Sequence, residues 1–243
     1  MPGAQKANAY PFYVDIPTWT EGSWYKLNSS HVIKKILASA LGLALTLTPS
    51  LAQNWTEKLN TPLQVALVNP IQIFRQDYDV SGIRLNLIYG KNTNVSGVDL
   101  GLVNFTSSKQ EGLQVGVFNF VGDELTGGQI GFVNRATAHS SGVQVGFLCN
   151  LSQTNLTGYQ SGSINLVNGD FHGFQSGELL NVIKGNGVGV QASLFNFAHG
   201  NFDGLQIGLI NTAQSLRGVQ IGLININSSS NYMSFFPFIN MAF

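Results

Sequence analysis

The residues of this sequence that could do acid–base or metal chemistry are few and do not gather. The histidines are His31, His139, His172 and His199, and Cys149 is the single cysteine. A metal site or an activated nucleophile needs several such groups at set spacings, and no cysteine or paired carboxylate accompanies the histidines. We therefore expect solvated turn histidines, no metal site, and a Cys149 that fills a small core position beside Phe147.

Two acidic pairs, Asp123-Glu124 and Asp77-Tyr78-Asp79, are the remaining candidates. We interpret both as surface turns, with weak calcium binding as the alternative, because the regular Gly-Gly-x-Gly-x-Asp calcium repeat is missing. Residues 185–189 are glycine-rich but lack the Gly-Lys-Ser/Thr of a phosphate loop. A chain of similar units also has no unique place in which to perturb a pKa. The sequence therefore predicts a protein that is not an enzyme and has no cofactor.

The composition of the chain excludes several classes of protein. Its 243 residues carry no formal net charge, and only 10% are charged, against about 25% in typical soluble proteins. Equal numbers of basic and acidic residues give no excess of positive charge for binding nucleic acid, and a single cysteine excludes a disulfide framework. Few charges with much Gly, Asn, Gln and Ser indicate either a barrel that faces a membrane or a stacked repeat protein.

The N-terminal part carries an export signal. Residues 36–47 are apolar, follow Lys34-Lys35 and precede Ser50-Leu51-Ala52, a small-x-small cleavage site. At about 12 residues the run is too short for a membrane-spanning helix, which needs about 20. We predict a signal peptide over 32–52. The preceding residues 1–31 have no periodicity, and our hypothesis is that they are a non-native extension from a wrongly assigned translation start, the true start being Val32.

An internal repeat of about 15 residues fills the rest of the chain. Aligned on the phrase Gly-x-Gln-x-Gly-x-x-Asn, the anchor positions recur at spacings of 14 to 16: Arg84, Asp99, Gln114, Gln129, Gln144, Gln160, Gln175, Gln191, Gln206 and Gln220. An Asn follows each anchor from Asp99 onward by five or six residues. We divide the chain after the signal into a linker and N-terminal cap at 53–80, a repeat domain at 81–227 and a C-terminal cap strand at 228–243.

A five-residue period lies inside each unit. In 118–132 and 195–209 each five reads x, Asn/Asp/Gln, a large apolar residue, usually a small residue, and x. This resembles the pentapeptide-repeat pattern, although three fives form a unit here and that family usually places four in a coil. The resemblance implies an apolar residue that points into the coil.

A second resemblance covers about 62–243. The phrases Val98-Asp99-Leu100-Gly101-Leu102-Val103-Asn104 and Gly204-Leu205-Gln206-Ile207-Gly208-Leu209-Ile210-Asn211, with the Phe-rich end 235–238, are similar to the exported surface-repeat proteins of bacteria, leptospiral type. The likeness implies an exported location and no particular activity.

Two all-β architectures agree with the repeat, because its short alternating segments are typical of strands. In a β-solenoid each unit of about 15 residues is one coil, and the apolar side chains fill a narrow core. In an outer-membrane β-barrel of about twelve strands each unit is a strand and a turn, and Phe243 resembles a terminal insertion signal. Uniform turns and a short apolar face favour the solenoid. Glu178 fits its core only if Leu179 marks a bulge that turns the carboxylate outward.

The solenoid interpretation assigns two sets of residues. In the alternation of 204–209, Leu205, Ile207 and Leu209 share one face, which we place in the core, and the Gly-Gln-Gly face then points outward. The predicted interaction face is Gln114, Gln129, Gln144, Gln160, Gln175, Gln206 and Gln220, with flanking glycines that let a partner approach. The predicted structural Asn ladder is Asn104, Asn119, Asn134, Asn150, Asn165, Asn196, Asn211 and Asn225.

The resulting functional expectation is a structural or interaction module. It would be exported to the cell surface, the outer membrane or the periplasm. Its partner would be an unknown protein or another component of the cell envelope, and it could associate with the outer membrane. We expect no nucleic-acid partner. The alternative is an outer-membrane pore or transport protein.

Overall fold

The structure is a computed structural model that describes residues 59–231 and 233–243. The predicted N-terminal extension, the signal peptide and the first residues of the linker lie outside the described residues.

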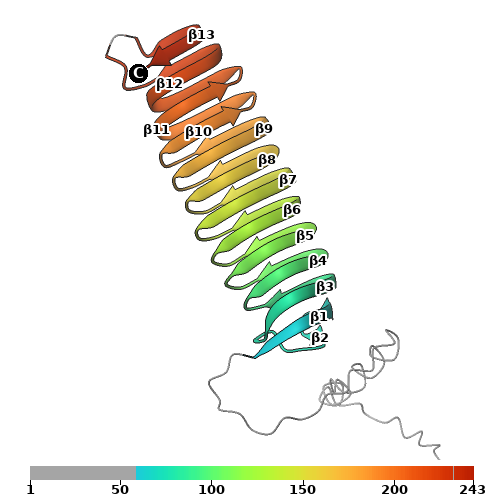
Figure 1. The fold of residues 1–243 in the computed structure, drawn as a ribbon. Coiled ribbons are helices and arrows are strands. Elements are labelled where there is room, and N and C mark those ends of the chain that lie inside the picture. The colour runs from blue at the N-terminus through green and yellow to red at the C-terminus, as the bar shows by residue number, and fades with distance from the viewer. Residues whose placement is uncertain (1–58, 232) are drawn as a thin grey trace, which may run out of the picture. The chain divides into compact units, whose positions relative to one another are not determined.

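The described chain folds into strands that belong to one sheet (Figure 1). In chain order the strands are β1 (Asn60–Val68), β2 (Ile71–Gln72), β3 (Asp79–Asn92), β4 (Val95–Thr106), β5 (Gln110–Val121), β6 (Leu125–Ala136), β7 (Ser140–Ser152), β8 (Leu156–Val167), β9 (Phe171–Ile183), β10 (Gly187–Ala192), β11 (Phe195–Ile207), β12 (Ile210–Asn227) and β13 (Phe235–Ala242). Each strand lies beside its sequence neighbours, except that β3 pairs with β1 and β9 also pairs with β11.

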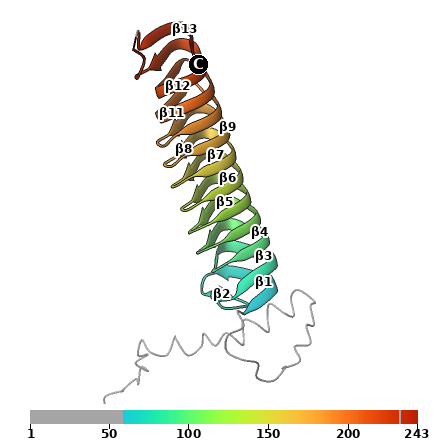
Figure 2. The same cartoon turned by 60° about the vertical axis from the view of Figure 1, so that its left-hand side comes forward.

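Neighbouring repeats pair in parallel and in register, which confirms the solenoid of about 15 residues per turn. In β5 and β6, for example, Gln114 lies beside Gln129 and Asn119 beside Asn134. The stack has about 11 turns, all wound in the same direction (Figure 2). The alternative barrel would place consecutive repeats in antiparallel hairpins, so the parallel register excludes that architecture for this fold.

The two ends of the stack differ from its middle. β1 already pairs in parallel with β3, so the stacking begins before residue 81. β2 then turns back antiparallel against β1. At the other end β13 lies antiparallel to β12, in the segment that the sequence assigned to a C-terminal cap strand.

Each coil is a long strand that bends sharply in its middle and closes through a short turn. In β5 the bend follows Gly116, and the turn is formed by residues 122–124. A glycine two residues before each anchor from Arg84 to Gln220 has a positive φ, between 108° and 149°. At Gly142 a Cβ would lie 1.9 Å from the carbonyl oxygen of Gly127 in the preceding coil. The repeated glycines are therefore needed by the backbone itself.

The interior of the coil is narrow and mixed in character. Amide side chains occupy two of the inward positions, and the inward positions on each side of the turn are apolar in many coils. The apolar positions join into a cluster of Leu156, Val167, Phe171, Ile183, Ala198, Phe202, Ala213 and Leu216. A smaller cluster contains Val121, Leu125 and Ala136. These clusters lie toward the turn, and the amides fill the side toward the bend.

Candidate interaction surface

The glutamines of the predicted interaction face are buried. Gln114, Gln129, Gln144, Gln160, Gln175, Gln206 and Gln220 all have 0% exposure, as has Gln191. The assignment of these side chains to an outward contact face is therefore wrong. The alternation of each strand was correct, but the face that points inward is the one with Gln.

The buried glutamines form a continuous hydrogen-bonded ladder from Gln114 to Gln220. From Gln129 onward, the Nε2 of each donates to the Oε1 of the glutamine in the preceding coil at 2.7 to 2.9 Å. Asn240 of β13 continues the ladder by donating to Gln220 at 2.8 Å. Each amide of the ladder has a hydrogen-bond partner in the neighbouring coil. The usual free-energy penalty for burying an amide is therefore avoided.

The predicted Asn ladder is present, and it too is buried. Asn104, Asn119, Asn134, Asn150, Asn165, Asn181, Asn196 and Asn211 each donate from Nδ2 to the Oδ1 of the next coil's asparagine at 2.8 to 3.0 Å. Each also donates to a backbone carbonyl 10 or 11 residues later, such as Asn119 to Ile130 at 2.9 Å. The Asn ladder donates toward the C-terminus and the Gln ladder toward the N-terminus, so the two rows of amide dipoles oppose one another.

In the two coils before the Gln ladder begins, an ion pair occupies the positions that Gln occupies later. Arg84 and Asp99 are both 0% exposed, and Arg84 donates from Nε to Oδ1 at 2.8 Å and from Nη2 to Oδ2 at 2.5 Å. Arg84 also donates to the hydroxyl of Thr106, and Gln114 donates to Asp99. The pair thus joins the ladder through bonds to its polar neighbours.

The outer surface of the coils is apolar at the bend. The side chains there form an apolar ridge, which we define as Leu87, Leu102, Val117, Phe132, Phe147, Leu148, Leu179, Leu194, Leu209 and Leu223; each is between 39% and 71% exposed. Leu85, Leu100, Ile130, Val145, Ile207 and Ile221 extend this surface onto the neighbouring arm and are also exposed. The predicted core residues Ile207 and Leu209 thus face outward, which corrects that part of the sequence interpretation.

Aromatic side chains stack between coils on this outer surface. The rings of Phe132 and Phe147 lie 5.1 Å apart, and those of Tyr159 and Phe174 lie 5.6 Å apart. An open groove follows the solenoid axis beside the ridge, where Glu178, Leu194, Leu209, Leu223 and Phe238 line it. The ridge and the groove together give the molecule a long apolar side.

One carboxylate interrupts the ridge column. Glu178 of β9 is exposed and accepts a hydrogen bond from the Ser163 hydroxyl at 2.9 Å. The register between β8 and β9 shifts between Gly162 and Ile164, opposite Glu178 and Leu179.

Glu178 faces outward because it lies three positions after the inward Gln175, as Leu209 does after Gln206 in a coil without an extra residue. Its orientation therefore does not depend on the bulge at Leu179. Glu178 divides the ridge into a segment that ends at Leu148 and a segment that begins at Leu179.

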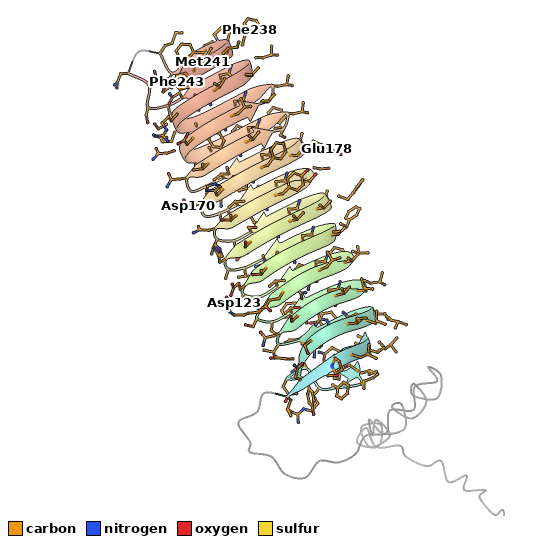
Figure 3. The ribbon with its side chains drawn as sticks, viewed as in Figure 1. Asp123, Asp170, Glu178, Phe238, Met241 and Phe243 are labelled. Carbon is orange, nitrogen blue, oxygen red and sulfur yellow. The ribbon has the colours of Figure 1, made fainter. Side chains whose placement is uncertain are left out.

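Many of the charged side chains lie at the turns, on the opposite side of each coil. Asp123, Asp170 and Lys109 lie there, and Figure 3 shows Asp123 and Asp170 along one long side of the solenoid with Glu178 on the other. Lys109 and Glu124 form an ion pair at 2.7 Å. Their hydrogen bond raises the pKa of Lys109 and lowers the pKa of Glu124 from the ordinary values. The coil is thus amphipathic in cross-section.

The candidate chemical residues lie apart from one another. His139, His172 and His199 are exposed, and no three His, Cys, Asp or Glu residues of the described chain lie close enough to hold a metal ion. Cys149 is half-buried at an outward position next to Asn150, and Phe147 is exposed, so the predicted core role of Cys149 is wrong. Burial raises the pKa of the Cys149 thiol.

No protein-family model, curated protein or solved structure matches the chain. Within residues 59–243, apart from 232, no helix is long and apolar enough to cross a membrane. The apolar ridge is the feature that sequence reasoning missed. Its signal was available in the variation of the outward positions. One outward column holds Gly128, Tyr159 and Phe174 in different coils, whereas Gln and Asn recur at the inward positions of nearly every coil.

Proposed function

We propose that the chain is a structural and interaction module of the cell envelope, exported through its N-terminal signal and without catalytic activity of its own. Its contact surface is the apolar ridge with the neighbouring outward columns. The sequence resemblance to exported surface-repeat proteins supports the location, and the arrangement of the side chains supports the mode of contact.

The observation that carries this proposal is the inverted distribution of polarity. The amides are inside and satisfied by one another, whereas the ridge side chains are exposed, Phe147 to 71%. A large continuous apolar surface on a folded protein marks a site of interaction with another protein or a membrane. The Gln ladder is available to no partner, because its amides are fully buried.

Cell fractionation tests the proposal on the full chain. Cells that produce it are separated into cytosol, periplasm and envelope, and the envelope is washed with high salt. We expect the chain in the envelope fraction and resistant to the wash, because apolar contacts are not screened by salt. The double substitution F147D/L223D, at two exposed ridge positions, should release the chain into the soluble periplasmic fraction.

The matched control is H139D/N201D, which adds the same two carboxylates to exposed positions outside the ridge. The control should stay in the envelope. A chain that remains in the cytosol contradicts the exported location, and equal retention of all three proteins contradicts the ridge as the contact surface. Circular dichroism of the purified proteins checks that each variant keeps its β structure.

A further inference from the structure

We infer that the surface this ridge contacts is a lipid bilayer, with the solenoid lying lengthwise on the membrane. The inference rests on the proposed function and specifies its partner. The ridge side chains would enter the boundary between headgroups and acyl chains, while the turn side, with Asp123 and Asp170, stays in water.

The backbone at the ridge is already satisfied by the stacking of the coils. Leu209 donates to the carbonyl of Leu194 at 2.9 Å, and Ile224 donates to that of Leu209 at 2.9 Å. Hydrocarbon tolerates only backbone whose polar groups are paired within the protein. Because each coil is paired to the coils on both sides, the bend can enter the apolar region without exposing unpaired N–H or C=O groups.

Many polar side chains of the bend are satisfied as well, although Asn86 Oδ1 and the Ser193 hydroxyl are buried without a hydrogen-bond partner. Asn119 and Asn134, which sit directly beneath the bend, use their amides within the Asn ladder and on backbone carbonyls at 2.8 to 2.9 Å. In the ridge column only Glu178 is charged among the described residues. The surface offered to lipid is thus apolar over most of its length.

The dimensions of the ridge agree with a planar partner. About 11 turns at about 4.8 Å per strand give a stack of about 50 Å. The hydrocarbon core of a bilayer is only about 30 Å thick, and the coils carry polar turns along the whole stack. An orientation in the plane of the membrane buries the ridge and keeps those turns hydrated, which an upright orientation does not.

The exposure and charge of the ridge favour lipid over a protein partner. Phe147 is exposed to 71%, and within the ridge column of the described chain only Glu178 is charged. The ridge also lacks the rim of charged residues that fixes the register of a protein complex. A fluid bilayer needs neither a matching shape nor matching charges, so it is the partner that these features fit.

Vesicle flotation tests the inference with the purified full chain. The probes are vesicles of phosphatidylcholine alone and vesicles that also contain phosphatidylglycerol, each at low and high salt. The chain has no formal net charge, so we expect it to float with both kinds of vesicle and to be insensitive to salt. F147D/L223D should lower the partition coefficient by about tenfold or more, and H139D/N201D should leave it unchanged.

A gain-of-binding variant sharpens the test. Glu178→Leu removes the one carboxylate of the ridge column and leaves only Ser163 between its two segments, so the partition coefficient should rise several-fold. Glu111→Leu removes the same charge from an exposed position outside the ridge and should change binding little. Because these side chains are exposed, neither substitution should prevent folding.

Three results would overturn the bilayer inference. The first is no flotation with either vesicle, and the second is flotation only with phosphatidylglycerol at low salt, which indicates binding by charge. The third is a stable dimer in solution that F147D/L223D dissociates, which identifies a second copy as the occupant of the ridge. If the chain is retained in envelopes through its ridge but does not float, the proposed function stands and its partner is another envelope component.

Discussion

Arg84 and Asp99 occupy successive coils at the position where later coils stack one Gln on the next. Their side chains are fully buried, and two hydrogen bonds of 2.8 and 2.5 Å join the guanidinium to the carboxylate. The ladder thus changes from an ion pair to neutral amides at Gln114, which donates to Asp99 at 3.0 Å. The pair lies where the regular stack begins, one coil above β1.

A double-mutant cycle measures the interdependence of this pair. Arg84→Gln or Asp99→Gln alone leaves one charge buried without its partner, and each should lower the free energy of unfolding by about 3–5 kcal/mol. The double variant places amide on amide, as the rest of the ladder does, and should lose less than either single variant. Urea denaturation followed by circular dichroism gives the three values. Additive losses would show that the two residues act independently.

Conversion of a ladder amide to a carboxylate should destabilise the solenoid. In Gln144→Glu the new carboxylate replaces the Nε2 donor that bonds Gln129 at 2.8 Å and is buried among amides. We expect a loss of about 3 kcal/mol or more at neutral pH, which becomes smaller as the pH falls and the carboxyl is protonated. Thr157→Glu, at an exposed position of β8, is the control and should change the melting temperature little.

The sequence predicted the period, the parallel stack and the registers but assigned the faces the wrong way round. Alternation in 204–209 shows that Gln206 and Ile207 point to opposite sides, and it does not show which side is inside. The usual preference for apolar interiors then placed Ile207 in the core. That preference fails here because identical coils bring each amide into hydrogen-bonding reach of its copy in the next coil, so that burial of Gln206 leaves few unmet bonds.

The candidate surface was harder to predict for the same physical reason. Phe147 is a ridge residue because it lies three positions after the inward Gln144, so the reversed faces misplaced it as well. Leu148 beside it is also exposed because the coil bends there, and a strand pattern does not contain that three-dimensional feature. The stronger indication was composition, since a chain with 10% charged residues has little polar material with which to cover its outside. The shortage of charge that favours a membrane barrel or a stacked repeat also implies an apolar outer surface for the solenoid.

The reactivity of Cys149 tests its half-buried position on the arm beyond the bend. Burial raises the pKa of the thiol, so a smaller fraction is thiolate at neutral pH than in an exposed cysteine. Alkylation by iodoacetamide should be slower in the folded chain than in urea, and it should accelerate as the pH rises above the usual range of a cysteine. Mass spectrometry gives the rates, with the unfolded chain as reference. Equal rates in both states would show that the thiol is freely exposed.

Two glycines of β6 and β7 are needed to different degrees. One has a positive φ and packs against the neighbouring backbone, and the other has neither constraint. Gly142 has a φ of 139°, and a Cβ there would lie 1.9 Å from the carbonyl oxygen of Gly127. Gly128 has no positive φ, and the nearest atom to its Cβ would be Cδ1 of Leu113 at 3.0 Å, the end of a flexible side chain. Other coils place Val143 or Leu113 at the position of Gly128.

Alanine substitution should therefore have opposite consequences at the two sites. Gly142→Ala forces the backbone away from the neighbouring coil and should lower the free energy of unfolding by about 2–4 kcal/mol, within the range of severe substitutions. Gly128→Ala restricts the unfolded chain and fills a gap in an outward column, so stability should be unchanged or higher by about 0.5 kcal/mol. Thermal and urea unfolding of both variants give the comparison. A Gly142→Ala variant as stable as Gly128→Ala would refute the close stacking of the glycine column, and with it the tight spacing on which both amide ladders depend.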